Sequence, residues 1–226
     1  MENFWISLMG PATMHFNEEN LKSLIMQPAN AWTNLFYIIA GILIFMLYPK
    51  DNNNYKIRLL PWIAILVGIS SFLYHAHFIF LFQVFDLSSM FLLSSFLLVF
   101  NMVRLKIIKN SRFFIIYALV FLISLFILLL IQKQSGEILF AVMIVSTIVL
   151  EIICGLKNKS VRYRDLYITI GLIALALGFW LLDVNHLLFT PQNHIIQGHG
   201  LWHFTNSFCF LFLYKFYRQF EVIEAK

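Results

Sequence analysis

The stretch GISSFLYHAHFIFLFQVFD, residues 68–86, is almost wholly apolar, yet it contains His75 and Asp86. A second apolar stretch far along the chain contains QGHGLWHF, in which His199 and His203 are one helical turn apart. Ionisable side chains inside hydrocarbon are costly and need a partner, an ion or a water cavity. Histidines and a carboxylate in two distant apolar stretches therefore predict one buried metal site.

The composition is that of a polytopic membrane protein. Of the 226 residues, 61% are hydrophobic and 12% are charged, and the mean hydropathy is +0.81. A soluble domain is about 45–50% apolar and about 25% charged. The opening segment MENFWISLMGPATMHFNEEN lacks the features of a cleavable signal peptide. Cys154 and Cys209 lie in apolar stretches, so we interpret them as small buried side chains rather than as a disulfide.

Seven apolar stretches divide the chain, and each is about long enough to cross a hydrocarbon core of ~30 Å. Short polar connections separate them, so we expect a single domain over residues 1–226, with residues 1–32 as an extracytoplasmic N-terminal segment. The predicted spans are Thr33–Tyr48, Leu59–Ile79, Val84–Val103, Phe113–Ile131, Gly136–Leu156, Asp165–Asp183 and Gln197–Tyr217.

The basic residues predict the orientation. If the N-terminus is outside, all but two of the 16 lysines and arginines fall on the cytoplasmic side, the exceptions being Lys22 and Lys133. Cytoplasmic segments of membrane proteins carry such an excess. We therefore expect an all-α bundle of seven transmembrane helices with the N-terminus outside and the C-terminus cytoplasmic. The net charge of +5 is then a topology signal, and no nucleic-acid partner is expected.

This orientation brings separately encoded polar groups to one depth. His75 would lie near the outer end of the second helix, which runs outward. Asp86, His199 and His203 would lie near the outer starts of the third and seventh helices, which run inward. Scattered structural histidines have no reason to converge in this way, so the convergence predicts a site in the outer leaflet.

The spacing of these residues suggests catalytic zinc. His199 and His203 lie on one helix face, where two imidazoles can share an ion. His75 is the expected third ligand, which leaves the fourth tetrahedral position for water. Ser71 lies one turn before His75 on the same face. Asp86 could accept a proton from the bound water or orient a ligand imidazole.

Other polar residues have simpler interpretations. Single histidines near helix ends are usually interface residues, and we assign this role to His77, His186 and His194. Asp183 ends the sixth span on the same side as the histidines and is a candidate for supporting a ligand. We expect Glu151, near an inner helix end, to be snorkelling or paired.

The pattern Ser71-x-x-x-His75, Asp86 and His199-x-x-x-His203 resembles the alkaline ceramidases. That family belongs to a superfamily of seven-helix membrane hydrolases that includes the adiponectin and progestin receptors. The segments QPANAWTNLFYIIAG and GFWLLD also resemble the ceramidase branch. The resemblance covers nearly the whole chain.

The resemblance implies that His75, His199 and His203 bind zinc and that Ser71 and Asp86 complete the catalytic centre. The family cleaves the amide of ceramides to a sphingoid base and a fatty acid. The implied substrate is therefore ceramide or a related N-acyl lipid, and no obligate protein partner is evident.

The resemblance also raises the question of calcium, because ceramidases of this type can carry an acidic N-terminal calcium site. Glu18 and Asn20 match two of its positions. His15 and Asn30 stand where carboxylates would be expected. Fewer hard anionic ligands should weaken calcium binding, and the alternative is a solvated segment that caps the bundle.

Two other functions remain open at this point. A receptor-like member would bind lipid at the same site with little hydrolysis, and a transporter would use the histidines as a transient path. Clustering of the polar groups at one end of the helices argues against transport. The expected location is a bacterial inner membrane in a prokaryote and an endomembrane otherwise.

Overall fold

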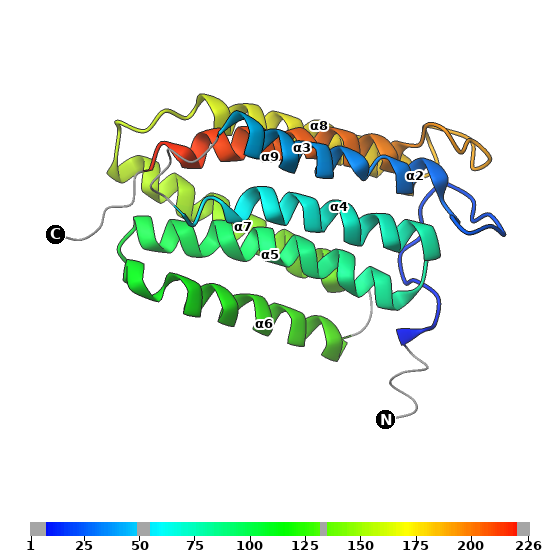
Figure 1. Ribbon diagram of the computed structural model, residues 1–226, viewed down its shortest axis with the longest axis horizontal. Coiled ribbons are helices and arrows are strands. Elements are labelled where there is room, and N and C mark those ends of the chain that lie inside the picture. The colour runs from blue at the N-terminus through cyan, green and yellow to red at the C-terminus, as the bar shows by residue number, and fades with distance from the viewer. Residues whose placement is uncertain (1–7, 49–54, 132–134, 221–226) are drawn as a thin grey trace. The chain divides into compact units, whose positions relative to one another are not determined.

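The computed structural model describes residues 8–48, 55–131 and 135–220, and their regular structure is helical apart from one isolated bridge between Pro11 and Ile79. This confirms the expected all-α class. The elements, labelled in Figure 1, are α2 (Pro28–Trp32), α3 (Leu35–Leu47), α4 (Leu59–His77), α5 (Phe80–Arg104), the short 3-10 helix η1 (Asn110–Arg112), α6 (Phe113–Ile131), α7 (Ser135–Lys157), α8 (Arg164–Val184) and α9 (Gly198–Arg218).

Six helical segments of the described chain are long and apolar enough to cross a membrane. They comprise α2 with α3, then α4, α5, η1 with α6, most of α7, and α8. The chain is therefore a multi-pass membrane protein, as expected. Helix α9 has 21 residues but does not belong to the six. The seventh crossing and the orientation remain predictions, and Lys133, used in the charge argument, lies outside the described residues.

The chain forms two compact units, which are described separately. The first takes its described residues from Met1–Asp86 and Arg162–Val222. It contains α2, α3, α4, the first turns of α5, α8 and α9. Helix α8 packs along α9, and α3 packs against both α4 and α9. Figure 1 shows the N-terminal segment and the loop between α8 and α9 at the same end of this unit.

Two glycines allow α3 and α4 to pack closely. A Cβ atom at Gly41 would lie 2.6 Å from the carbonyl oxygen of Pro61, and one at Gly68 would lie 2.8 Å from that of Asn34. Both distances are too short for a real side chain. Helices in membranes gain much of their association energy from such small-residue contacts, because lipid is as apolar as the side chains themselves. The contact fixes the position of α4, which carries His75.

The second unit takes its described residues from Leu87–Val161 and contains the remainder of α5, η1, α6 and α7. The hydroxyls of Ser94 on α5 and Ser124 on α6 lie 3.5 and 3.4 Å from the sulfur of Met143 on α7. Arg104 and Glu151 form a largely buried ion pair between α5 and α7. Glu151 is therefore paired, one of the two roles expected for it. A single domain over residues 1–226 remains a prediction.

The N-terminal segment crosses the turn between α4 and α5. Phe78 ends α4 with a left-handed backbone (φ 51°), which a bulky residue adopts only where its surroundings enforce it. The N–H of Ala12 donates to the Phe78 carbonyl at 3.3 Å, and the N–H of Phe80 donates to the Gly10 carbonyl at 2.9 Å. The N–H of Gln27 donates to the His75 carbonyl at 3.1 Å. The segment is thus hydrogen-bonded to the backbone beside the expected site.

Candidate metal centre

Three histidine side chains from two helices converge in the first unit. His75 comes from α4, and His199 and His203 come from the first turns of α9. The ring centroids are 4.9 Å apart for His75 and His199, 5.0 Å for His75 and His203, and 4.3 Å for His199 and His203. All three are buried, and one nitrogen from each lies within 4.8 Å of the others. The rings are close enough to bind one ion.

The contacts of His75 determine which of its nitrogens can bind a metal. Its Nδ1 lies 2.8 Å from Oε1 of Gln27. The amide nitrogen of Gln27 donates to the backbone carbonyl of Glu18 at 3.3 Å, which orients the amide because a carbonyl only accepts. Nδ1 of His75 must then donate. Its Nε2 is buried with no partner among the described residues, and this nitrogen carries a free lone pair.

His203 is oriented in the same way by α2. Its Nδ1 lies 3.1 Å from the Asn30 carbonyl and 3.2 Å from the Thr33 hydroxyl. Because the carbonyl accepts, Nδ1 donates and Nε2 keeps its lone pair. The close approach of α9 to α2 depends on Gly200, since a Cβ atom there would lie 3.2 Å from the Ala29 carbonyl oxygen.

His199 is held through its backbone. Its N–H donates to Oδ1 of Asp183 at 2.9 Å, and the other carboxylate oxygen accepts from the N–H of Asn17 at 3.0 Å. A carboxylate at the first turn of a helix satisfies free N–H groups and interacts favourably with the helix dipole. The His199 ring stacks on Phe16 with centroids 3.8 Å apart. Its Nδ1 is buried with no partner among the described residues.

These features fit a metal ion. Two buried ring nitrogens, on His75 and His199, have no hydrogen-bond partner in the described part of the chain, and such orphaned groups are rare in folded proteins. The Nδ1 atoms of His75 and His203 are bonded to oxygen acceptors, as ligand histidines are in known metal sites. Three neutral imidazoles suit a transition metal better than calcium or magnesium. The expected cluster is therefore present as a possible metal site, and the ion is not identified.

Two further site residues were expected, Ser71 and Asp86. Ser71 is buried on α4, one turn before His75. Asp86 is partly buried on α5. The catalytic roles of Ser71 and Asp86 remain predictions.

The remaining histidines divide into two groups. His77 is exposed and its Nδ1 lies 3.1 Å from its own helix's Leu73 carbonyl, as expected for an interface residue. His186 and His194 do more than line an interface. Nδ1 of His186 lies 2.8 Å from Oδ1 of Asn17, and Nδ1 of His194 lies 3.1 Å from Oε1 of Glu18. Both attach the α8–α9 loop to the N-terminal segment.

Three residues that orient the ligands were not predicted from the sequence. Gln27 contacts His75, whereas Asn30 and Thr33 contact His203. They belong to the run QPANAWTN, which enters the first membrane helix. A polar run at the start of an apolar span is the signal that could have identified them, because each polar group there needs a partner.

Comparison with known protein families identifies a related family. A family model described as Ceramidase matches residues 11–226. The matched range covers nearly the whole chain and includes the histidine cluster and the residues that orient it. A search of curated proteins finds no significant match.

Proposed function

The chain belongs to the ceramidase family, and from this we propose that it is a zinc-dependent amidohydrolase of the membrane. The proposed substrate is ceramide or a related N-acyl lipid, which hydrolysis of the amide would convert to a sphingoid base and a fatty acid. The observation that carries the proposal is the buried cluster of His75, His199 and His203 with two unpartnered ring nitrogens. A family match alone would not indicate that this chain retains catalytic groups.

The three histidines would hold the zinc. A bound zinc ion supplies a water of lowered pKa, about 7, and polarises a carbonyl oxygen. Only three protein ligands converge in the described cluster, which suits a catalytic site with an open position rather than a closed structural site. Gln27 and the Asn30 carbonyl support the role by fixing two of the rings.

Asp86 is proposed as the general base and acid. Its carboxylate would take a proton from the attacking water and return one to the leaving amine. Its place in the pattern Ser71-x-x-x-His75, Asp86 and His199-x-x-x-His203 and its partial burial in the first unit support this role. Without this second proton transfer, the sphingoid base would have to leave as the unstable anion of its amine.

Ser71 is proposed to stabilise the oxyanion. The amide carbonyl gains negative charge during attack, and a hydroxyl placed beside it would donate a hydrogen bond. Burial of Ser71 one turn from His75 supports this role, since a hydrogen bond counts for more where water is excluded. The serine would be a hydrogen-bond donor and not a nucleophile.

The membrane arrangement is part of the proposal. We propose seven crossings with the N-terminus outside, so that the histidine cluster lies towards the outer leaflet. The bias of the basic residues supports this orientation. Apolar side chains such as Trp32, Leu66 and Phe204 are exposed on the helices of the first unit, and they would face lipid, from which a two-chain substrate could enter.

The test is zinc content together with ceramide hydrolysis, measured on detergent-purified protein. We expect about one zinc per chain, the stoichiometry of a single site with three protein ligands and an open position. His203→Ala should lose both zinc and hydrolysis. Asp86→Asn should keep the zinc and lose turnover. Ser71→Ala should keep the zinc and lose about 10²–10³ in kcat, the usual effect of removing one oxyanion donor.

The outcomes separate the alternatives. A well-folded wild type that binds no zinc would refute the hydrolase mechanism. Zinc binding without hydrolysis of any N-acyl lipid would favour the receptor-like function. An active His203→Ala variant would refute the ligand assignment, and full turnover by Asp86→Asn would exclude that residue as the general base.

A further inference from the structure

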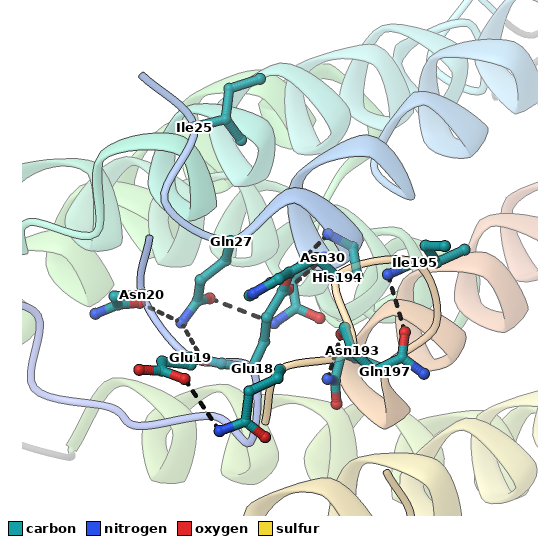
Figure 2. Close-up of polar contacts among 12 residues, drawn as sticks. Glu18, Glu19, Asn20, Ile25, Gln27, Asn30, Asn193, His194, Ile195 and Gln197 are labelled. Carbon is teal, nitrogen blue, oxygen red and sulfur yellow. Dashed lines mark hydrogen bonds and ion pairs between the residues drawn. The ribbon is translucent and has the colours of Figure 1, made fainter. Parts of the chain in front are cut away.

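A buried polar network joins the N-terminal segment to α2 and to the α8–α9 loop, and Figure 2 shows Glu18 in contact with both Asn30 and His194. The Glu18 side chain is fully buried. Its Oε1 accepts from the N–H of Ala29 at 2.8 Å and from His194 at 3.1 Å, and its Oε2 accepts from the N–H of Asn30 at 2.9 Å. Gln27 donates to Oδ1 of Asn20 at 2.8 Å.

These residues do not fit the calcium ion that the family resemblance suggests. Calcium takes six to eight oxygen ligands, usually with several carboxylates. Both oxygens of Glu18 and the side-chain oxygen of Asn20 already accept hydrogen bonds. His15 is exposed and brings no carboxylate. Oδ1 of Asn30 is a buried acceptor with no partner in the described chain, and one neutral oxygen is far short of a calcium shell.

The groups around Glu18 are instead hydrogen-bond donors. A buried carboxylate is costly unless it is paired or hydrogen-bonded. Burial raises the pKa of the Glu18 carboxyl, whereas the N–H groups of Asn30 and Ala29 and the His194 side chain lower it. The two N–H groups belong to the first turn of α2, whose free donors favour an anion. The protein's own donors therefore stabilise the carboxylate that a cation would otherwise bind.

The network also reaches two of the three metal-site histidines. The Glu18 carboxylate holds the first turn of α2, and the Asn30 carbonyl in that turn accepts from His203. The Glu18 backbone carbonyl orients Gln27, which accepts from His75. A displacement of Glu18 would thus act on each of the two histidines through one intervening residue.

We propose that His194 and the α2 N–H groups take the place of a cation at Glu18, so that this protein positions its metal-site histidines without calcium. Glu18 and His194 are positioning residues in this proposal and do not touch the substrate. The positioning part rests on the proposed function, because it assumes that the histidines hold a metal ion. The absence of calcium binding does not depend on that function.

The first experiment measures calcium directly. The full chain, purified in detergent and depleted of divalent ions, is dialysed against radioactive calcium at about 1 mM, the range of weak extracellular sites. We expect no stoichiometric binding and no change in the midpoint of thermal unfolding, with or without zinc. About one bound calcium per chain, together with a raised midpoint, would overturn the proposal. Neither readout requires hydrolysis, so an inactive protein would leave the result valid.

The second experiment tries to create a calcium site. His194→Asp replaces the donor beside Glu18 with a second carboxylate. We expect a lower unfolding midpoint and zinc affinity reduced by about tenfold or more, the usual effect of disturbing residues that orient ligands. Calcium should restore both. Ile195→Asp is the matched control, because Ile195 is the next residue and is 83% exposed; it should behave as wild type with or without calcium.

A His194→Asp variant with unchanged midpoint and zinc affinity in the absence of calcium would overturn the role of His194. Should this variant fail to fold, His194→Gln keeps a donor without the carboxylate. It should bind zinc within about threefold of wild type, because the glutamine amide can still donate a hydrogen bond to the Glu18 carboxylate. A His194→Gln variant that binds zinc only after calcium is added would also contradict the proposal.

Discussion

Helices α6 and α9 differ most clearly in how apolar they are and in how much of each helix is buried. Helix α6 is the most apolar of the candidate spans, and within it only Phe113, Ser124 and Leu128 are buried. Helix α9 falls outside those spans, yet most of its residues are buried, including His199 and His203. Hydropathy identifies surfaces that face lipid. Two of the polar residues that make α9 a weak membrane signal, His199 and His203, belong to the candidate metal site.

The strongest test of this contrast is the loss of one ligand. His199→Ala should abolish zinc binding and lower ceramide hydrolysis by about a thousandfold or more, because a catalytic zinc contributes several kcal/mol to the transition state. Ile115→Ala in α6 removes a side chain that is 64% exposed, and its hydrolysis should stay within about twofold of wild type. Metal analysis and a ceramide assay measure both. Equal losses in the two variants would mean that α9 has no special role.

A second test asks whether the buried ion pair between Arg104 and Glu151 affects zinc binding or only stability. Arg104→Met leaves the carboxylate of Glu151 buried without its cation and should lower the free energy of unfolding by about 3–5 kcal/mol. The double variant with Glu151→Leu should recover most of that loss. Zinc content per folded chain should be unchanged in both, as thermal unfolding in detergent and metal analysis would show. Loss of zinc in the stable double variant would contradict a purely structural role.

Substitution of Asp183, whose carboxylate accepts hydrogen bonds from the start of α9, should have a smaller effect. Asp183→Asn weakens charge-assisted hydrogen bonds to the N–H groups of His199 and Asn17. We expect a loss of about 1.5–3 kcal/mol in the free energy of unfolding and zinc binding about 10–100-fold weaker. Competition with a chelator measures the affinity. Wild-type zinc affinity in this variant would mean that backbone capping does not position His199.

The smallest effects should come from a matched pair of glycines. A Cβ atom at Gly198 would lie 2.9 Å from both Asp183 Cβ and the Phe179 carbonyl oxygen, whereas one at Gly171 on α8 would meet nothing within 4 Å. Gly198→Ala should destabilise by about 1–3 kcal/mol. Gly171→Ala should be neutral or stabilising by up to about 1 kcal/mol. Equal unfolding midpoints would mean that the contact between α8 and α9 is not tight.

The sequence was sufficient to predict the helices and the ligand cluster. Apolar run length predicted seven helical stretches, and six spans are confirmed by length and composition. The spacing of His199 and His203 placed two ligands on one face, and the convergence argument added His75. Both inferences use regular helix geometry, which a sequence pattern reports directly. The seventh crossing, the orientation and the roles of Ser71 and Asp86 stay predictions.

The groups that surround the ligands could not be predicted in the same way. Gln27 comes from an irregular segment with no periodicity, and Asn30 acts on His203 through its backbone carbonyl, which no side-chain pattern reports. His186 and His194 were interpreted as interface residues, but they bond to Asn17 and Glu18. The first candidate membrane span also starts at Pro28, inside the segment expected to precede the membrane. The contacts of Gln27, Asn30, His186 and His194 all join residues that are far apart in the sequence.

The order of the ligands along the chain has a consequence for synthesis. His75 leaves the ribosome long before His199 and His203, which belong to the last described helix. At about 5–20 residues per second the interval is on the order of ten seconds. During that time a nascent chain has one of the three clustered histidines. The cluster can therefore assemble only after α9 has been made, so an unfinished chain lacks the complete candidate site.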